Sequence, residues 1–283
     1  MPTVRDLLAD ARLRLIAAPF EPSRREAALL LGHVLGLSEA QVIARNEREV
    51  EPDAAARFAE LLSRRLTGEP VSYLFGEREF YGRVFRVDRR VLIPRPETEH
   101  LVEEALKAPL PPDPWILDIG AGSGILAVTL ALEIPGARAV TTDVSPGALA
   151  VAAGNARRLG AAGRVLPVGA DLAGGLDLGR FDLVVSNPPY IDPAEAATLS
   201  PEVCNFEPHL ALFAPGSTGE GDSILERLFA ELRTLRSGVR LLLEIGFGQL
   251  DVARRHAESS GWIVLGVRAD YAGIPRVMTV QRP

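Results

Sequence analysis

The sequence predicts an α/β protein: a mostly parallel sheet with helices on both faces, preceded by a small all-α N-terminal bundle and a linking β-hairpin. Three observations point to this class. Four short amphipathic stretches fill the first 75 residues, strand-forming residues flank a glycine at 77–87, and short apolar runs alternate with helical stretches from about residue 91 onward. Such alternation is typical of a parallel sheet covered on both faces. We therefore expect domains at 1–75 and 91–283, joined by a hairpin at 76–90.

Four helices are expected in the N-terminal domain. Thr3 and Ser38 are suitable N-caps for the first and third, and Pro22 and Pro52 open the second and fourth. Apolar residues recur at helical spacing in each stretch, so the four helices can pack as a bundle. Because no cluster of titratable residues recurs there at a functional spacing, we favour an accessory domain over a second active site.

The larger domain is predicted to contain seven strands. They are expected at 115–119, 139–142, 165–168, 181–185, 239–245, 262–265 and 277–280, with helices at about 124–133, 146–159, 223–235 and 249–259. The last two strands follow one another without a long crossover connection. We therefore expect one of them to run antiparallel at the edge of the sheet.

The composition excludes several classes of protein. The chain has 31 Lys and Arg against 37 Asp and Glu, a formal net charge of −6, which argues against a surface that binds a phosphate backbone as a whole. Cys204 is the single cysteine and the four histidines lack metal-ligand spacing, so we expect no disulfide and no metal. With neither a long apolar run nor a signal-peptide core, we expect a cytoplasmic protein.

Two motifs predict a site for a nucleoside-bearing cofactor. Asp118-Ile119-Gly120-Ala121-Gly122-Ser123-Gly124 follows a predicted strand and opens a helix, and its glycines let the backbone approach a ligand closely. Asp143 ends the next strand, where a carboxylate can accept hydrogen bonds from two ribose hydroxyls. The alternatives are a purely structural turn and an N-cap for the helix that begins at Ser145-Pro146. The glycine spacing differs from Gly-x-Gly-x-x-Gly, which favours a cofactor without pyrophosphate.

A third motif indicates the chemistry. Asn187-Pro188-Pro189-Tyr190 follows the fourth strand, at the edge where open α/β sheets bind ligands. The Asn187 side-chain oxygen and the Pro188 carbonyl can accept both N–H groups of a planar NH₂, and adjacent prolines fix the carbonyl's direction. Tyr190 offers a flat apolar face. The motif therefore suits methyl transfer to a planar NH₂ group, although Asn-Pro-Pro can also form a merely rigid turn.

Together these motifs resemble S-adenosylmethionine-dependent amino methyltransferases. More narrowly, the chain resembles the glutamine N5-methyltransferases that modify class 1 peptide-chain release factors. The further matching segments are 76–82, 92–99 (Leu-Ile-Pro-Arg-Pro-Glu-Thr-Glu), Glu207-Pro208 with Ala211-Leu212, and Leu243-Glu244-Ile245-Gly246 with Gln249. The resemblance covers most of the chain and implies a Rossmann-like methyltransferase fold at 91–283.

The resemblance also implies the substrate and the partners. The methyl group would pass from S-adenosylmethionine, leaving S-adenosylhomocysteine, to the glutamine of a Gly-Gly-Gln loop, in support of translation termination. The helical domain at 1–75 would hold the rest of the release factor. We expect a monomer that binds no membrane and no nucleic acid directly.

Residue roles follow from the same resemblance. Residues 120–124 and Asp143 would bind the methionine and ribose parts of the cofactor, and Asp171 and Leu172 would border its adenine, with leucine where the family often has an aromatic residue. Asn187 would also contact the cofactor. Asn187, Pro188, Pro189 and Tyr190 would bind the substrate, and Asn187, Pro188 and Tyr190 would be the catalytic residues.

Several alternatives stay open. Adenine-specific nucleic-acid methyltransferases share Asn-Pro-Pro-Tyr, and a glutamine methyltransferase for a ribosomal protein is a closer rival. Arg95 and Glu97 can brace the cofactor pocket or form an internal ion pair. Glu207 can bind a backbone N–H near the substrate or cap a turn.

Overall fold

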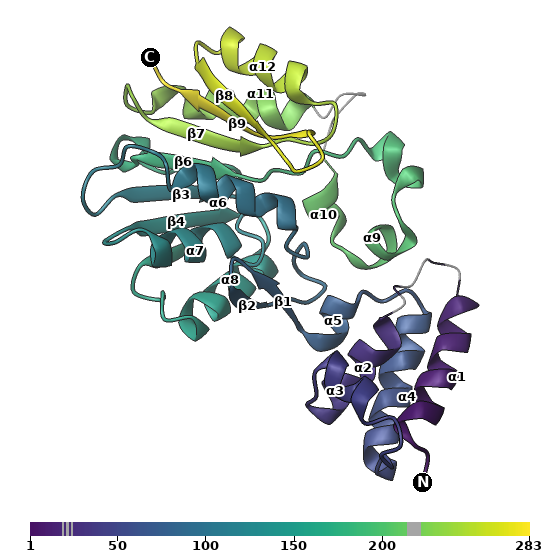
Figure 1. The fold of residues 1–283 in the computed structure, drawn as a ribbon. Coiled ribbons are helices and arrows are strands. Elements are labelled where there is room, and N and C mark those ends of the chain that lie inside the picture. Colours follow the sequence, from purple (N-terminus) through teal and green to yellow (C-terminus); the bar gives the residue numbers. More distant parts are fainter. Residues whose placement is uncertain (19, 21–22, 24, 214–221) are drawn as a thin grey trace. The chain divides into compact units, whose positions relative to one another are not determined.

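The structure is a computed structural model of the 283-residue chain that describes all residues except 19, 21–22, 24 and 214–221 (Figure 1). The described chain divides into two compact units. The first comprises Met1–Gly76 and Leu199–Phe206, and the second comprises Glu77–Thr198 and Glu207–Pro283. The first has one hydrophobic core and the second has two, one on each face of its sheet.

The first unit is helical. Its helices are α1 (Val4–Ile16), α2 (Glu26–Leu35), α3 (Glu39–Ala44), α4 (Pro52–Leu66), α5 (Val71–Phe75) and α9 (Pro201–Phe206). The four predicted helices are confirmed: Thr3 and Ser38 both form capping boxes. The prediction at Pro22 lies outside the described residues. No signal in the sequence pointed to α5, or to the grouping of α9 with residues far earlier in the chain.

A two-stranded hairpin opens the second unit. Strands β1 (Glu77–Phe80) and β2 (Arg83–Arg86) pair antiparallel. Tyr81 and Gly82 form the two-residue turn with φ angles of 51° and 70°, the left-handed conformation that such hairpin turns require. The predicted hairpin is therefore confirmed.

The second unit is built around a seven-stranded sheet of order β5-β4-β3-β6-β7-β9-β8. The first five strands in that order are parallel, and β9 is antiparallel to both of its neighbours. The bounds are β3 (Trp115–Ile119), β4 (Arg138–Asp143), β5 (Val165–Gly169), β6 (Leu183–Ser186), β7 (Arg240–Glu244), β8 (Ile263–Ala269) and β9 (Pro275–Gln281). The predicted fold class is confirmed.

The expected place of the antiparallel strand is wrong. The antiparallel strand β9 lies inside the sheet, and β8 forms the edge. In this order β9 buries Val277, Met278 and Val280, whereas β8 leaves Ile263 and Leu265 exposed. An interior strand is paired along both of its edges, whereas an edge strand has one side open.

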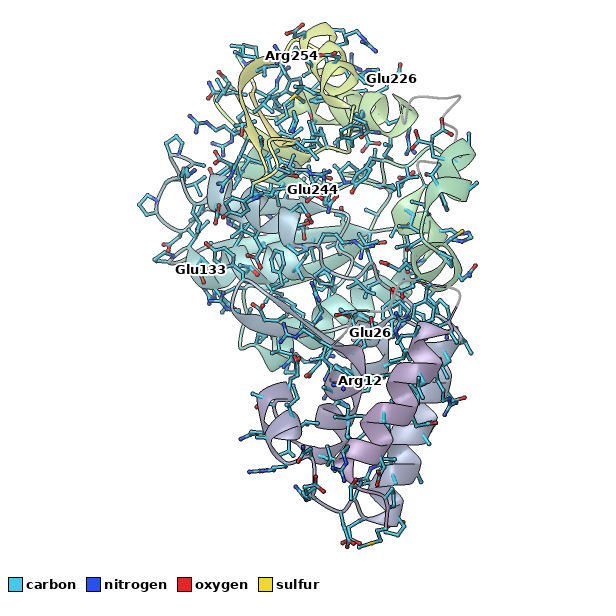
Figure 2. All side chains as sticks on the ribbon, turned by 45° about the vertical axis from the view of Figure 1, so that its right-hand side comes forward. Arg12, Glu26, Glu133, Glu226, Glu244 and Arg254 are labelled. Atoms are coloured by element: carbon cyan, nitrogen blue, oxygen red, sulfur yellow. The ribbon has the colours of Figure 1, made fainter. Side chains whose placement is uncertain are left out.

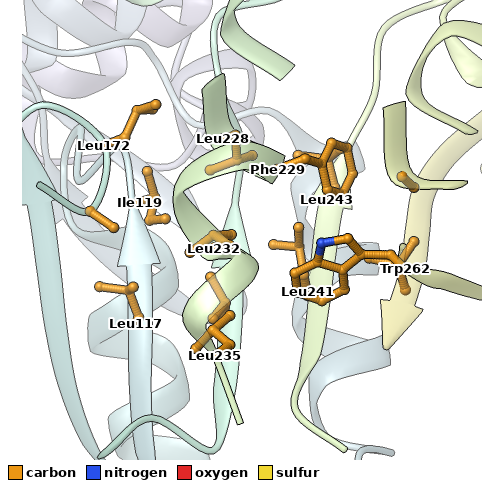
Figure 3. Packing of buried hydrophobic residues seen from close by; sticks show 14 of the residues in the cluster. Leu117, Ile119, Leu172, Leu228, Phe229, Leu232, Leu235, Leu241, Leu243 and Trp262 are labelled. Atoms are coloured by element: carbon orange, nitrogen blue, oxygen red, sulfur yellow. The ribbon is translucent and has the colours of Figure 1, made fainter. Parts of the chain in front are cut away.

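Helices cover both faces of the sheet (Figure 1). Alternate strand residues face opposite cores: Ile116 packs in one and Leu117 in the other. The helices are α6 (Glu99–Ala105), α7 (Ile125–Glu133), α8 (Pro146–Arg158), α10 (His209–Leu212), α11 (Asp222–Glu231) and α12 (Leu250–Ser259). Figure 3 shows Leu228, Leu232 and other residues packed near Leu117 and Leu241.

Within the described chain, no helix is long and apolar enough to cross a membrane.

Candidate active site

A cavity of about 330 Å³ lies in the second unit at the carboxyl ends of β3, β4 and β6. The chain passes from β3 to β4 and β5 on one side, and β6 and β7 lie on the other. Such a reversal of strand order leaves a crevice, which is where open α/β sheets bind ligands. The lining comes from residues 90–98, 119–126, 142–148, 170–172, 186–189, 208–211, Ile224 and Arg227, although not every residue in these ranges contributes.

The glycine loop forms one wall of this cavity. Gly120 and Gly124 have φ angles of 91° and 81°, which residues other than glycine rarely adopt. The Gly120 and Ala121 N–H groups donate to the Thr142 carbonyl at 2.9 and 2.7 Å. A Cβ at Gly124 would stand 3.0 Å from the Cβ of Ala152. Gly124 therefore also lets the start of α7 pack closely on α8.

Asp143 lines the cavity and ties the glycine loop to the next turn. Its Oδ2 accepts from the Gly122 N–H at 3.0 Å, and its Oδ1 accepts from the Ser145 N–H at 2.9 Å. The N-cap of α8 is Ser145, whose hydroxyl accepts from the Ala148 N–H. A carboxylate offers about four lone-pair positions. Asp143 thus retains acceptor capacity for two ligand hydroxyls.

Asp171 and Leu172 lie beside each other at the cavity but differ in burial. Asp171 is exposed and forms an ion pair with Arg227 at 2.5 Å. Leu172 is only 8% exposed and packs into the sheet core, with a φ angle of 50° that is unusual for leucine (Figure 3). Leu172 therefore supplies an apolar surface and Asp171 a charged one.

The Asn-Pro-Pro-Tyr loop meets the glycine loop at this cavity. Asn187, Pro188 and Pro189 line it, whereas Tyr190 is not among its lining residues. A Cβ at Gly120 would stand 3.6 Å from the Asn187 carbonyl oxygen. The Asn187 Nδ2 donates to Oγ1 of Thr98 at 3.3 Å. Two motifs that are separate in the sequence therefore share one cavity.

Tyr190 lies against the end of β7. Its carbonyl accepts from Nε2 of Gln249 at 2.6 Å, and Oε1 of Gln249 accepts from the Gly246 N–H at 3.1 Å. A Cβ at Gly246 would come within 2.7 Å of the Tyr190 ring. Burial, and then the nearby Glu244 carboxylate, raise the pKa of the Tyr190 hydroxyl. Gln249 and Gly246 therefore brace the loop, a role that sequence reasoning missed.

Thr98 and Glu244 are two further polar residues that sequence reasoning left without a role. Thr98 is fully buried and also lines the cavity, and Glu244 is 3% exposed. Burial raises the pKa of Glu244 to about 7, although side-chain hydrogen bonds with Thr98 and Asn187 oppose that rise. Their places in the sequence could have pointed to a role at the site. Thr98 stands in the segment ahead of the sheet, and Glu244 ends an apolar strand.

Arg95 pairs with Glu207. Its Nη2 lies 2.6 Å from Oε1 of Glu207, whose Oε2 accepts from the Ile93 N–H at 3.0 Å. Arg95 lines the cavity, and Glu97 is not among its lining residues. Glu207 is 4% exposed, so this internal ion pair fixes the segment ahead of the sheet. Among the described residues, no group of three or more His, Cys, Asp and Glu could hold a metal ion.

Two family models match different parts of the chain. The PrmC N-terminal domain family matches residues 6–76, and the methyltransferase small domain family matches residues 98–202. The solved structure of a methyltransferase from Pyrococcus furiosus superposes with a TM-score of 0.53 at 16% identity, covering 81% of this chain and 98% of that one. This likeness concerns the fold.

Curated relatives match nearly the whole chain. The release factor glutamine methyltransferase of Cereibacter sphaeroides is 42% identical, over 98% of both chains. The release factor glutamine methyltransferase of Koribacter versatilis is 41% identical, over 97% of both chains. The chain therefore belongs to the release factor glutamine methyltransferase family.

Proposed function

We propose that the protein transfers a methyl group from S-adenosylmethionine to the side-chain amide nitrogen of the glutamine in the Gly-Gly-Gln loop of class 1 release factors. This reaction supports translation termination. The observation that carries the proposal is the meeting of the glycine loop with Asn187 and Pro188 at one cavity. Family membership supports the choice of a release factor over a nucleic acid or a ribosomal protein.

The cavity fits a nucleoside-bearing methyl donor. The open backbone at 120–124 can accommodate the methionine part, Asp143 retains acceptors for ribose hydroxyls, and Asp171 and Leu172 offer a polar and an apolar edge for adenine. Asn187 stands between this region and the acceptor region. When bound, S-adenosylmethionine supplies an electrophilic methyl group on a positively charged sulfur.

The acceptor amide needs two hydrogen-bond acceptors. An amide nitrogen is a weak nucleophile because its lone pair is delocalised into the carbonyl. Oδ1 of Asn187 and the carbonyl of Pro188 can hold both of its N–H groups, which turns the lone pair toward the methyl group. Pro189 stiffens the loop, and Tyr190 supports it against β7. Positioning of this kind can recover about 7–11 kcal/mol of a reaction barrier.

The remaining assignments concern partners and location. The helical first unit holds the body of the release factor, because the cavity and the motifs assigned to the chemistry belong to the second unit. The protein acts as a monomer in the cytoplasm without binding nucleic acid directly, in keeping with its net charge of −6.

The test is a transfer assay with labelled S-adenosylmethionine and two substrates, a purified release factor and duplex DNA. Mass spectrometry should locate one added methyl group on the loop glutamine, and a Gln→Ala release factor should take up none. Asn187→Ala should abolish most turnover while cofactor affinity stays within about threefold, because its proposed role is at the acceptor nitrogen. Label on DNA adenine, or on neither substrate, would overturn the proposed acceptor.

A further inference from the structure

We infer that Glu244, acting together with Thr98, fixes which end of the Asn187 side-chain amide faces the methyl acceptor. Glu244 is thereby a positioning residue for the transfer. This inference rests on the proposed function, since it takes Asn187 as the group that holds the substrate amide. It gives a role to the Leu243-Glu244-Ile245-Gly246 segment, whose purpose the sequence motifs left open.

Sheet register brings Glu244 and Asn187 together. Strands β6 and β7 are parallel neighbours, and Ser186 pairs with Leu243. The next residue on each strand is Asn187 on one and Glu244 on the other, so both stand at the same level of the sheet's carboxyl edge. Thr98 comes from the short 3₁₀ turn (Pro96–Thr98) that leads into α6, and α6 packs against β7.

The hydrogen bonds allow one orientation of the Asn187 amide. The Glu244 carboxyl lies close enough to Thr98 and Asn187 that both, as hydrogen-bond donors, lower its pKa, and Nδ2 of Asn187 donates to Oγ1 of Thr98 at 3.3 Å. An ionised carboxylate can only accept hydrogen bonds. The Thr98 hydroxyl therefore donates its one hydrogen bond to Glu244 and accepts a hydrogen bond from the Asn187 amide. Both neighbours thus require the NH₂ end of Asn187, and Oδ1 is left for the substrate.

Rotation of the Asn187 side-chain amide by half a turn would place two hydrogen-bond acceptors opposite each other. Oδ1 would then face the Glu244 carboxylate, and the Nδ2 donor would turn toward the acceptor site. The substrate amide, which must donate both of its N–H groups, would meet another donor. A buried hydrogen-bonding group left unpaired costs about 1–3 kcal/mol. The ionised Glu244 therefore selects the productive orientation.

The burial of Glu244 is difficult to explain by packing alone. Its neighbours Leu242, Leu243 and Ile245 are apolar and buried, as a central strand requires. Its Oε2 is buried without a hydrogen-bond partner in the described chain. Burying a carboxyl group in this way is costly. A residue kept only to fill space at this position would be apolar.

Several charged or titratable groups face the Glu244 carboxyl. Arg276 of β9 lowers its pKa and Glu97 of the 3₁₀ turn raises it, while Tyr190 lies in the adjoining loop. The net result is a pKa of about 7. Protonation below that value would let the carboxyl donate as well as accept, which weakens the selection. Activity that depends on Glu244 should thus rise with pH through this range.

The test compares Glu244→Gln with the wild type and uses Glu226→Gln as the matched control. Glu226 is exposed on α11, outside the cavity lining, and undergoes the same chemical change (Figure 2). Glutamine presents a donor as well as an acceptor, so Glu244→Gln should lower kcat roughly 10- to 100-fold, with KM and cofactor affinity within about threefold. The rise of kcat near pH 7 should disappear in this variant only.

A second readout needs no substrate. The Asn187 side-chain NH₂ signal in the nuclear magnetic resonance spectrum, assigned by its loss in Asn187→Ala, should titrate near pH 7 in the wild type and in Glu226→Gln. It should not titrate in Glu244→Gln. An Asn187 signal that ignores Glu244, or a kcat that survives Glu244→Gln, would overturn the inference while leaving methyl transfer intact. A titrating signal in a protein that methylates no release factor would instead overturn the proposed function alone.

Discussion

Arg65 and Glu26 form an ion pair inside the first unit, with Nε of Arg65 2.8 Å from Oε2 of Glu26 and side-chain exposures of 2% and 10%. Arg65 also pairs with Glu202 of α9. One buried guanidinium thus joins two helices of the N-terminal bundle to the short helix that follows the acceptor loop in the sequence. The pairing is one link between Leu199–Phe206 and the residues with which it groups, which precede it by more than a hundred positions.

Arg65→Met should destabilise the first unit. Removal of the cation leaves the buried Glu26 without its partner, which typically costs about 3–5 kcal/mol. Hydrogen exchange at the amides of α2 and α4 should accelerate accordingly. Arg5→Met is the control, because Arg5 and Glu47 form an exposed pair that contributes less than about 1 kcal/mol. Equal effects of the two substitutions would contradict a structural role for the buried pair.

Gly124→Ala should cost more stability than Gly160→Ala. The two glycines have similar φ angles, 81° and 78°, so alanine carries the same backbone strain at both positions. A Cβ at Gly124 would press on Ala152 at 3.0 Å, whereas a Cβ at Gly160 would meet nothing within 4 Å. We expect an additional loss of about 1–3 kcal/mol at Gly124. Denaturant unfolding of both variants measures it, and equal losses would show that α8 yields freely.

Asp143→Ala should weaken binding of S-adenosylmethionine at least roughly tenfold, because charge-assisted hydrogen bonds contribute about 1.5–3 kcal/mol. Asp143→Asn should lose less, since its amide oxygen can still accept one of the two backbone N–H groups that Asp143 now holds. Titration calorimetry with the cofactor gives both values. Unchanged affinity in Asp143→Ala would remove the ribose assignment and leave Asp143 as a purely structural link.

Asp118→Asn should change how stability depends on pH. Burial raises the pKa of Asp118 from 3.8 to about 7, so between these values the folded state retains a proton that the unfolded state releases. This residue therefore makes the free energy of unfolding fall as the pH rises through that range. Asparagine stays neutral and keeps an oxygen that can accept from Thr141.

The Asp118→Asn variant should accordingly be more stable than the wild type above the folded pKa, by at most about 4 kcal/mol. The difference should close below the unfolded value of 3.8. Unfolding measured at several pH values tests this, and Glu244 titrates alike in both proteins, so its contribution cancels. A difference that stayed constant with pH would assign the effect to packing instead.

The local features of the chain were predictable from short stretches of sequence. Thr3 and Ser38 mark helix starts because their side-chain oxygens accept hydrogen bonds from backbone N–H groups only three residues later. Gly120 and Gly124 mark the loop because the φ angle is a property of single residues. The alternation of strands and helices predicted the parallel sheet, because parallel strands are joined by crossover helices. These helices cover both faces of the sheet, so its strands are apolar throughout.

Partners that are distant in the chain depended on the tertiary structure. The place of β9 inside the sheet, and the neighbours Thr98, Asn187 and Glu244 around one amide, depend on which strands pair and in which register. Register is a cooperative outcome of burying whole faces, so no single segment encodes it. The sequence by itself determined which groups are present at the ends of the strands; the folded sheet decided which of them meet.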